Sequence, residues 1–380
     1  MVRALFVPDR VAAGGVMKKL HAIVPAGGAG TRLWPISRQG HPKFLLDVTK
    51  SGWSLLQETV LRLGRVSQSV TVVTGLRHLS AVQNQLQRVL ESGRLPKGLL
   101  VAVIAEPSPR DSMPAIALAT YLLGKKYGSD ALIGSFAADH VIPEAHIFHD
   151  AVHRAIGAAE EGYLTTIGLE PTAPSTAYGY IHATDKEVAP GAFLVQNFEE
   201  KPSEKVAEAF IEDGYLWNAG MFIFQAKTVM DALAELHPQM HDALNQVVTA
   251  WRFLEQQEVL TRNWPRLERI SIDHALAEPL AQRGLVATTV MKGSKWTDLG
   301  DFASLAETER PPDQAKQHVV IDSPGSVVQV PPEKAAVVVG IPGVVVIDTP
   351  DALLVTTKEH AQRVKEGVDA LEDFGFPQYL

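Results

Sequence analysis

Short apolar runs alternate with amphipathic stretches over the first 140 residues of the chain. The apolar runs have the length of buried strands and lie at 21–25, 70–74, 99–104 and 131–137. Between them, helical periodicity predicts helices over 54–63, over 78–90 and from about 111 onward. Strict alternation of strand and helix is typical of α/β proteins that have a mostly parallel sheet with helices on both faces. We therefore predict a Rossmann-like, doubly wound sheet.

Two of the predicted helices have recognisable starts. Ser54 and Gln57 have the spacing of a capping box ahead of the apolar run 55–63. Pro114 falls in the first turn of the helix that begins near Asp111 or Ser112. In doubly wound sheets, ligands bind where strands end and the chain turns. We therefore expect the chemistry to reside in residues that directly follow strands.

The pattern changes in the second half of the chain. Residues 165–224 look more β-like, with one helix expected over 203–213. Polar helices then continue to about residue 280, and the segment ERPPD at 309–313 is typical of a linker. Short Val-rich strands between 319 and 355, broken by Pro and Gly, precede a helix expected over 358–373. We predict a poorly ordered extension over 1–16, a large α/β domain over 17–312, and a small β-rich, β-helix-like domain over 313–380.

Charge and composition narrow the class of function. The formal net charge of −8 argues against a general affinity for nucleic acid or an anionic membrane, so a phosphate site must concentrate its cations locally. The absence of cysteine excludes disulfides and thiolate metal sites, as expected in a reducing compartment. The longest apolar run, 335–347, is too short to span a bilayer, and residues 1–16 lack the apolar core of a secretion signal. We expect a cytoplasmic protein.

A glycine-rich turn directly follows the first predicted strand. In the segment PAGGAGTR at 25–32, the glycines leave backbone N–H groups unshielded, and these groups can close around phosphate oxygens. Taken alone, the segment is as well explained by a tight strand-to-helix turn. Arg32, Arg38 and Lys43 follow closely, and cations gathered behind a glycine loop in an acidic chain favour a polyphosphate ligand.

Two familiar phosphate loops do not fit this segment. A Walker A loop requires Gly-Lys-Ser/Thr after a glycine and four residues, and no such string begins at Gly27 or Gly28. A dinucleotide fingerprint that begins at Gly28 requires a glycine at position 33, where Leu33 stands. The spacing therefore argues against a kinase, a GTPase and a dehydrogenase.

The string GGAGTRLWPISRQGHPK resembles the signature of the sugar-nucleotide pyrophosphorylases, and its Leu-Trp-Pro and Ser-Arg elements resemble the mannose-1-phosphate guanylyltransferases in particular. Further motifs of the family follow in order over about residues 20–305: AADH at 137–140, YGY at 178–180, FEEKP at 198–202, WNAGMF at 217–222, SID at 271–273 and WTDLG at 296–300. The chain departs from the family at 110–114, where many members have Arg-Asn-Thr-Ala-Pro, and at Ala219, where many have serine.

The resemblance implies a fold of the nucleotide-diphospho-sugar transferase type and a reaction in which a sugar phosphate attacks the α-phosphorus of a nucleoside triphosphate. The expected pair is GTP and α-D-mannose 1-phosphate, giving GDP-mannose and diphosphate, and the expected assembly is a homodimer. Two alternatives stay open. One is an enzyme for another hexose 1-phosphate and nucleotide; the other is a non-catalytic relative that binds sugar nucleotide and regulates a partner.

The resemblance also assigns roles to residues. The nucleotide would be bound by Ala26, Gly27, Gly28, Gly30, Thr31, Arg110, Asp111 and Ser112, and the sugar by Gly179, Glu199 and Asn218. Arg32, Lys43 and Lys201 would offset phosphate charge, and no general base is expected because the attacking phosphate is already an anion. Asp139 and Asp298 would hold Mg²⁺ or Mn²⁺, which take carboxylate and phosphate oxygens.

Some of these residues have an equally simple structural explanation. Asp111 or Ser112 can be the N-cap of the following helix, Asp139 a helix cap and Asp298 a turn residue. Asp301 is better suited to capping than to metal binding. His237 and His241 have the spacing of helical zinc ligands, but no glutamate follows His237, so structural histidines are favoured.

Overall fold

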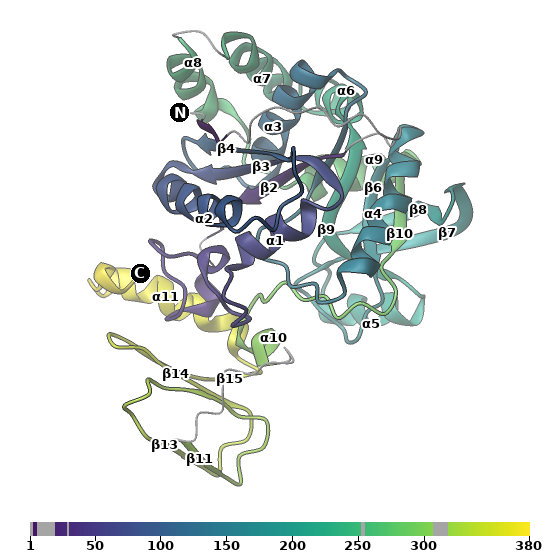
Figure 1. Cartoon of the computed structure of the whole chain (residues 1–380). Coiled ribbons are helices and arrows are strands. Elements are labelled where there is room, and N and C mark those ends of the chain that lie inside the picture. The colour runs from purple at the N-terminus through teal and green to yellow at the C-terminus, as the bar shows by residue number, and fades with distance from the viewer. Residues whose placement is uncertain (1–2, 6–19, 29, 252–254, 307–317) are drawn as a thin grey trace. The chain divides into compact units, whose positions relative to one another are not determined.

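The computed structural model of the chain describes residues 3–5, 20–28, 30–251, 255–306 and 318–380 (Figure 1). Their contacts divide the chain into two compact units, each built from separate stretches of sequence. The first unit comprises Met1–Gly27, Val60–Ala137 and Ile142–Lys295, and the second comprises Gly28–Thr59, Ala138–Val141 and Trp296–Leu380. The glycine-rich segment after Gly27 therefore belongs to the same unit as the C-terminal residues.

The first unit contains a ten-stranded sheet with the order β1-β4-β3-β2-β5-β9-β6-β10-β8-β7. Parallel pairing joins β4, β3, β2 and β5, and also β6 and β10, whereas the other neighbours are antiparallel. The strands are β1 Arg3–Leu5, β2 Leu20–Ala26, β3 Ser67–Gly75, β4 Leu100–Glu106, β5 Leu132–Ser135, β6 Leu164–Leu169, β7 Gly179–Ala189, β8 Ala192–Glu199, β9 Leu216–Gln225 and β10 Val286–Val290.

Up to residue 164 the helices alternate with the strands, as expected from the sequence, whereas the described part of 226–281 forms successive helices with no strand between them. The helices are α1 Leu55–Leu63, which joins the two units, then α2 Leu79–Glu91, α3 Ser112–Tyr127, α4 Ala145–Glu160, α5 Glu204–Glu212, α6 Ala226–Leu236, α7 Pro238–Ala250, α8 Gln256–Asn263 and α9 Glu278–Ala281. Parallel crossovers are right-handed, so α2, which leads outward to β4, and α3, which leads back to β5, lie on opposite faces of the sheet. The winding reverses between β2 and β5, which is where a doubly wound sheet binds ligands.

Helix α3 lies in the centre of the core. It packs against β2 and β3 on one side and against α6 and α7 on the other, and its residues from Met113 to Tyr121 are all buried. The Tyr121 hydroxyl contacts His241 Nδ1 at 2.6 Å, and His237 Nδ1 lies 3.2 Å from a Glu268 carboxylate oxygen. Both histidines thus have structural partners, as the sequence analysis favoured.

The second unit ends in short strands that form two small sheets. Strand β11 (His318–Ile321) pairs in parallel with β13 (Ala336–Val339), and β12 (Val327–Gln329) pairs in parallel with β14 (Val344–Asp348), which also pairs with β15 (Leu353–Thr357). Partners in both parallel pairs are 18 residues apart in the sequence. This constant spacing is that of one coil of a β-helix, as predicted.

One hydrophobic cluster holds the distant segments of the second unit together. It joins Leu33 and Leu55 from the first segment, Leu299 and Phe302 beside helix α10 (Phe302–Ala306), and residues of the C-terminal strands that include Val345. The chain then forms the 3₁₀ turn η6 (Ala361–Arg363), helix α11 (Val364–Asp373) and the turn η7 (Pro377–Tyr379). The helix predicted from residue 358 therefore begins later, after a 3₁₀ turn.

The capping box predicted at the start of α1 is confirmed. The Ser54 N–H donates to Gln57 Oε1 at 2.9 Å, and the Gln57 N–H donates to Ser54 Oγ at 3.2 Å. Strand β1 was not predicted from the sequence. It pairs antiparallel with β4, but its three residues, Arg3–Leu5, are too few to show a period-two pattern. The predicted linker at 309–313 and the rest of the predicted extension lie outside the described residues. Among the described helices, none has both the length and the apolar character needed to cross a membrane.

Candidate active site

The glycine loop after β2 is shaped by its contact with Lys43. Gly30 has a φ of +67°, and a Cβ at that position would lie 2.6 Å from Lys43 Cβ, so only glycine fits. Ser37 Oγ donates to the Gly30 carbonyl at 2.5 Å and fixes the far side of the turn. A Cβ at Gly28 would meet nothing within 4 Å, so the backbone there is open to a ligand.

Lys43 brings the two predicted metal ligands to one place in the second unit. Its side chain is only 7% exposed, and Nζ lies 2.5 Å from Asp139 Oδ2 and donates to the Asp298 main-chain carbonyl at 2.5 Å. Val141 and Thr297 exchange two backbone hydrogen bonds, at 2.9 and 3.1 Å, which hold the segments that carry the two aspartates side by side. We expected the chemical residues to follow strands directly, but Asp298 follows no strand of the main sheet, and an isolated β-bridge holds its segment instead.

The electrostatics of this cluster suit a divalent cation. Burial disfavours the ionised form of Asp139, but the Lys43 ammonium beside it holds the pKa of that carboxyl below its usual range. A metal ligand must be ionised, and hard carboxylate oxygens are what Mg²⁺ prefers. Among the described residues, no three His, Asp or Glu side chains gather to hold a metal. A cation held by Asp139 and Asp298 would therefore complete its coordination with phosphate oxygens and water.

Asp301 lies beside this cluster with a different role. Its Oδ1 accepts from the N–H groups of Ala303 and Ser304 at 2.8 and 2.9 Å, so it caps α10, as expected from the sequence. Its Oδ2 accepts from the Gln362 side-chain amide, whose oxygen in turn accepts from Arg32 Nη1 at 2.5 Å. The predicted catalytic Arg32 is thus held by the C-terminal segment.

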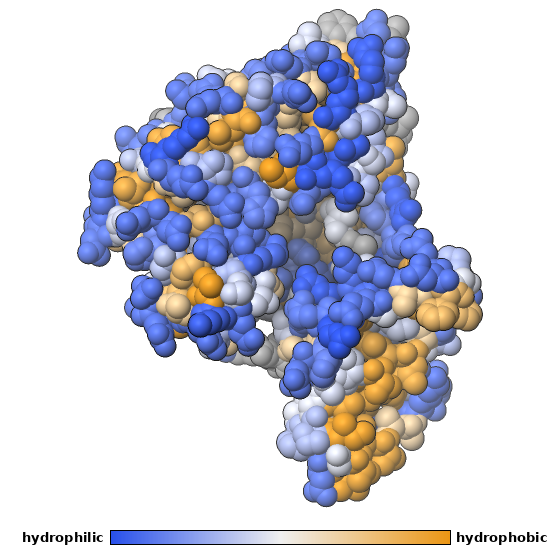
Figure 2. Space-filling view, turned by 180° about the vertical axis from the view of Figure 1, so that it is seen from behind, coloured by the Kyte–Doolittle hydropathy of each residue, from blue (hydrophilic) through white to orange (hydrophobic). Residues whose placement is uncertain are grey.

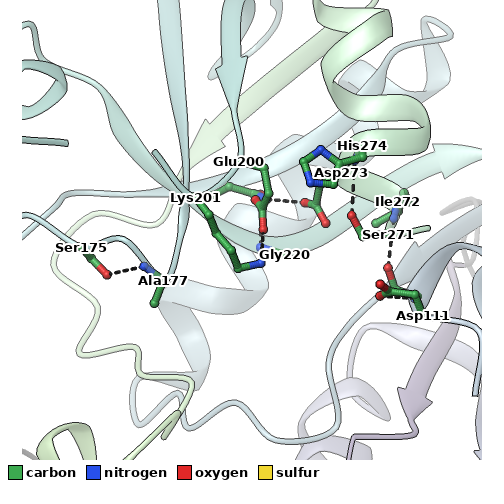
Figure 3. Close-up of polar contacts among 12 residues, drawn as sticks. Asp111, Ser175, Ala177, Glu200, Lys201, Gly220, Ser271, Ile272, Asp273 and His274 are labelled. Atoms are coloured by element: carbon green, nitrogen blue, oxygen red, sulfur yellow. Dashed lines mark hydrogen bonds and ion pairs between the residues drawn. The ribbon is translucent and has the colours of Figure 1, made fainter. Parts of the chain in front are cut away.

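A second polar cluster lies in the first unit, where Figure 3 shows Glu200, Lys201 and Asp273 close to one another. Asn218 of β9 belongs to this cluster. The Asn218 side-chain oxygen accepts from Thr166 Oγ1 at 2.8 Å and from the Gly220 N–H at 3.1 Å, and its nitrogen donates to Asp273 Oδ1 at 2.8 Å. Gly179 pairs with Asn218 across the sheet. Thr166 and Gly220 therefore fix the side-chain oxygen of Asn218, and its nitrogen holds Asp273.

Glu200 and Asp273 belong to this cluster, although sequence reasoning selected neither. A Cβ at Gly179 would lie 2.5 Å from Glu200 Oε2, so the glycine is what allows this carboxylate to approach. Lys201 Nζ contacts Glu200 Oε1 at 2.5 Å. Burial, with Glu200 nearby, raises the pKa of Asp273 to about 7. The cluster thus offers adjacent carboxyl groups and one cation, a set suited to the hydroxyls and phosphate of a sugar phosphate.

Glu199, predicted from the sequence, instead pairs with Tyr180 across β7 and β8. Glu199 is the last residue of β8, and a role for it in sugar binding stays a prediction. The signal that could have identified Glu200 is its position directly after the strand, next to Lys201.

The three residues predicted to read the base anchor a turn. Asp111 has a φ of +66°, and its carboxylate accepts from the Ser112 N–H at 2.8 Å as the N-cap of α3. Ser112 Oγ accepts from the Ile272 N–H at 3.0 Å, and Arg110 Nη1 donates to the Leu267 carbonyl at 3.0 Å. The helix-cap explanation is confirmed for Asp111, and base recognition stays a prediction.

Glu106, at the end of β4, is a further residue that sequence reasoning missed. It is 4% exposed, and its Oε2 has no hydrogen-bond partner among the residues that the structure describes. Its Oε1 lies 3.3 Å from where a Cβ on Gly27 would be, so the carboxyl adjoins the start of the glycine loop. Burial raises the pKa of Glu106 to about 7. A buried carboxyl without a partner is costly, so we interpret Glu106 as a ligand-binding group.

The doubly wound sheet, the glycine-rich turn that follows β2 and the Lys43–Asp139 ion pair suit a nucleotide-dependent transferase. The model of the nucleotidyl transferase family matches residues 21–311, and the chain belongs to that family. A second model, of the mannose-phosphate isomerase/GMP-like β-helix domain, matches residues 316–371.

Several similar proteins have names that refer to mannose 1-phosphate or to polysaccharide synthesis. The mannose-1-phosphate guanylyltransferase of Escherichia coli K12 is 35% identical over 94% of this chain and 74% of its own length. The xanthan biosynthesis protein XanB of Xanthomonas campestris is 34% identical with the same coverage. A solved structure from Thermus thermophilus, named mannose-1-phosphate geranyltransferase, superposes with a TM-score of 0.77 at 28% identity and covers 93% of this chain and 99% of its own.

Proposed function

We propose that this protein is a mannose-1-phosphate guanylyltransferase that converts GTP and α-D-mannose 1-phosphate to GDP-mannose and diphosphate. A phosphate oxygen of the sugar phosphate attacks the α-phosphorus of GTP and forms the new P–O bond. The bond from the α-phosphorus to the bridging oxygen breaks, and diphosphate leaves. The observation that carries the proposal is the cluster of Lys43, Asp139 and Asp298 behind the open glycine loop, together with the similarity to guanylyltransferases.

The residues of the second unit would act on the triphosphate. The reaction needs alignment and charge neutralisation more than proton transfer. The open backbone at Gly28 would bind phosphate oxygens, and Lys43 and Arg32 would offset the charge that develops on the transferring and leaving groups. Asp139 and Asp298 would hold Mg²⁺, which would supply Lewis-acid stabilisation of the phosphate oxygens.

The cluster of the first unit would bind the sugar phosphate. Lys201 would hold the phosphate, while Glu200 and Asp273 would accept hydrogen bonds from ring hydroxyls. Asn218 would keep Asp273 in place, and the contact of Glu200 with Gly179 supports a closely packed sugar ring.

Glu106 supports the choice of GTP over other nucleotides. Guanine offers two adjacent donors, its N1–H and its 2-amino group, which one carboxylate can accept as a pair. Adenine, cytosine and uracil each place an acceptor beside their donor, and a carboxylate would repel it. The ionised form of Glu106, which burial disfavours and which two guanine donors would stabilise, would therefore favour guanine.

A pyrophosphate-release assay tests the function and the role of Glu106 together. Across four nucleoside triphosphates and several hexose 1-phosphates with Mg²⁺, we expect GTP with mannose 1-phosphate to be the fastest pair. Glu106→Gln replaces one acceptor by a donor, so kcat/KM for GTP should fall roughly 10²-fold, the loss typical of one mispaired bidentate contact. Glu91→Gln, an exposed change at the end of α2, is the control. A preference for glucose 1-phosphate with UTP would contradict the proposed pair, and undetectable turnover would favour a regulatory relative.

We also propose a homodimer formed through the outer face of β11 and β13. Val319 lies beside Val337 and Ile321 beside Val339 in the parallel register, and all four are about half exposed or more. Figure 2 shows apolar side chains gathered on this part of the second unit. An apolar surface shared by identical chains suits an isologous contact, which needs about 800 Å² from each partner.

Sedimentation velocity tests the dimer. Val337→Lys should convert a dimer to a monomer, whereas Leu285→Lys, at another exposed apolar position, should leave the assembly unchanged. A wild-type protein that sediments as a monomer at micromolar concentration would rule out this assembly. We also propose that the enzyme is cytoplasmic, because a chain without cysteine has no disulfides, as is usual for proteins of that reducing compartment.

A further inference from the structure

Gln362 lies beside Arg32, although 330 positions separate the two residues along the chain. It lies in the turn η6, yet its side chain bridges Arg32, beside the glycine loop, and Asp301, three residues after Asp298. All of these residues belong to the second unit. The turn η1 (Thr31–Leu33), which carries Arg32, also packs against η6 and α11.

The chemistry of the bridge allows only one orientation of the amide. Arginine can only donate and the Asp301 carboxylate can only accept, so the Gln362 oxygen must face Arg32 and its nitrogen must face Asp301. Asp301 is itself fixed, because its other oxygen caps α10. A continuous polar connection therefore leads from the start of α10 through Gln362 to one nitrogen of Arg32. Within the described part of the chain no other hydrogen bond occupies the guanidinium, so its remaining N–H groups are left for phosphate oxygens.

The rest of the loop segment is anchored to the same C-terminal region. Trp34 Nε1 donates to the Tyr379 carbonyl at 2.7 Å, and Arg38 donates to that carbonyl as well. Arg38 Nη2 also pairs with Asp351 at 2.9 Å. These contacts are made by the side chains of Trp34 and Arg38, to which we assign no part in the reaction. Gln362 differs from them because it holds the guanidinium of Arg32, which we do assign to the reaction.

We propose that Gln362 is a positioning residue for nucleotidyl transfer: it orients the Arg32 guanidinium toward the triphosphate and so makes the C-terminal segment a part of the phosphate-binding site. The inference rests on the proposed function of Arg32. A positioning contact and an inhibitory contact predict opposite changes in kcat. Removing a residue that positions Arg32 lowers kcat, whereas removing one that keeps Arg32 away from the substrate raises it.

The first test is a double-mutant cycle on kcat, measured with the substrate pair that the wild type turns over best. Gln362→Ala should lower kcat roughly tenfold and leave the thermal midpoint and the KM for the sugar phosphate unchanged, because the residue lies at the surface. In the Arg32→Ala background, Gln362→Ala should lower kcat less than about twofold, because the guanidinium that Gln362 positions is absent. Arg363→Ala, which breaks an exposed ion pair with Glu366 in the adjoining turn, is the matched control and should retain full activity.

A charge-swap rescue separates positioning from a general structural role. Gln362→Glu keeps an acceptor for Arg32 but brings its carboxylate against that of Asp301. Asp301→Asn keeps the oxygen that caps α10 but brings its amide nitrogen against that of Gln362. Each single variant should therefore lower kcat. Combined, the two changes restore a donor at 301 facing an acceptor at 362, so kcat should recover above either single variant.

Binding of inorganic pyrophosphate, measured by calorimetry with Mg²⁺ present, gives a readout that needs no turnover. Gln362→Ala should weaken it several-fold in the wild-type background and not in Arg32→Ala. Additive effects of the two substitutions, absence of rescue, or a Gln362→Ala variant more active than the wild type would each overturn the inference. Failure of the wild type to make GDP-mannose would instead refute the proposed function, and the pyrophosphate cycle would still decide on Gln362.

Discussion

Replacing either Asp139 or Asp298 by Asn should lower kcat by roughly 10² to 10⁴, which corresponds to several kcal/mol of lost transition-state stabilisation. Asn keeps the shape of the side chain and removes the charge that a cation requires. The double variant should be barely worse than the poorer single variant, because the two carboxylates act as a unit. Steady-state assays at saturating Mg²⁺ measure the loss, and electron paramagnetic resonance of bound Mn²⁺ should show weaker binding in both.

The two substitutions should differ in stability. Asp139→Asn leaves the buried Lys43 without its ion pair, whereas Lys43 contacts Asp298 through a main-chain carbonyl, which Asn keeps. Asp139→Asn should therefore lower the free energy of unfolding more than Asp298→Asn does. Asp322→Asn, at an exposed site in the same unit, is the control for both measurements. Near-normal turnover of Asp298→Asn at saturating Mg²⁺ would show that Asp298 is only a turn residue.

Lys43→Met should lower kcat by roughly 10² or more, the typical cost of removing one preorganised charge from a transition state. It should also destabilise the protein in a pH-dependent way. Lys43 holds the folded-state pKa of Asp139 below its usual value of 3.8, so the pair stabilises the fold fully above that value. This contribution is lost as the pH falls through the folded-state pKa.

Urea unfolding of the wild type and of Lys43→Met, at neutral pH and near pH 3, tests the direction of this pH dependence. The difference in unfolding free energy should be largest at neutral pH and should shrink in acid. Lys365→Met, an exposed change in α11, should show no difference at either pH. A difference that is equal at both pH values would mean that Lys43 stabilises the fold by packing and not through Asp139.

Features with a local signal could be predicted from the sequence. The strands β2 to β5, the Ser54 capping box and the glycine loop each depend on residues that are neighbours along the chain, and the structure contains all of them. The aspartates were found because each lies in a short motif. Such signals need only a few adjacent residues, so one sequence is enough to recognise them.

Features that depend on distant parts of the chain could not be predicted. Gln362 contacts Arg32 across 330 positions and lies in a helix-like pattern with nothing to distinguish it from its neighbours. Glu106 became visible only as a buried carboxyl beside Gly27. Glu199 and Glu200 differ by a single position, and which of them approaches Gly179 is decided by where β8 ends.

The discontinuous make-up of the second unit sets the order in which a growing chain can fold. Residues 28–59 are synthesised early, but their core partners at 299–305 and 327–347 emerge from the ribosome last. The whole first unit has been synthesised by residue 295 and can fold while synthesis continues. The glycine loop and Lys43 must wait for the end of the chain, so a nascent protein that is interrupted near residue 300 would carry a folded sheet without a working phosphate site.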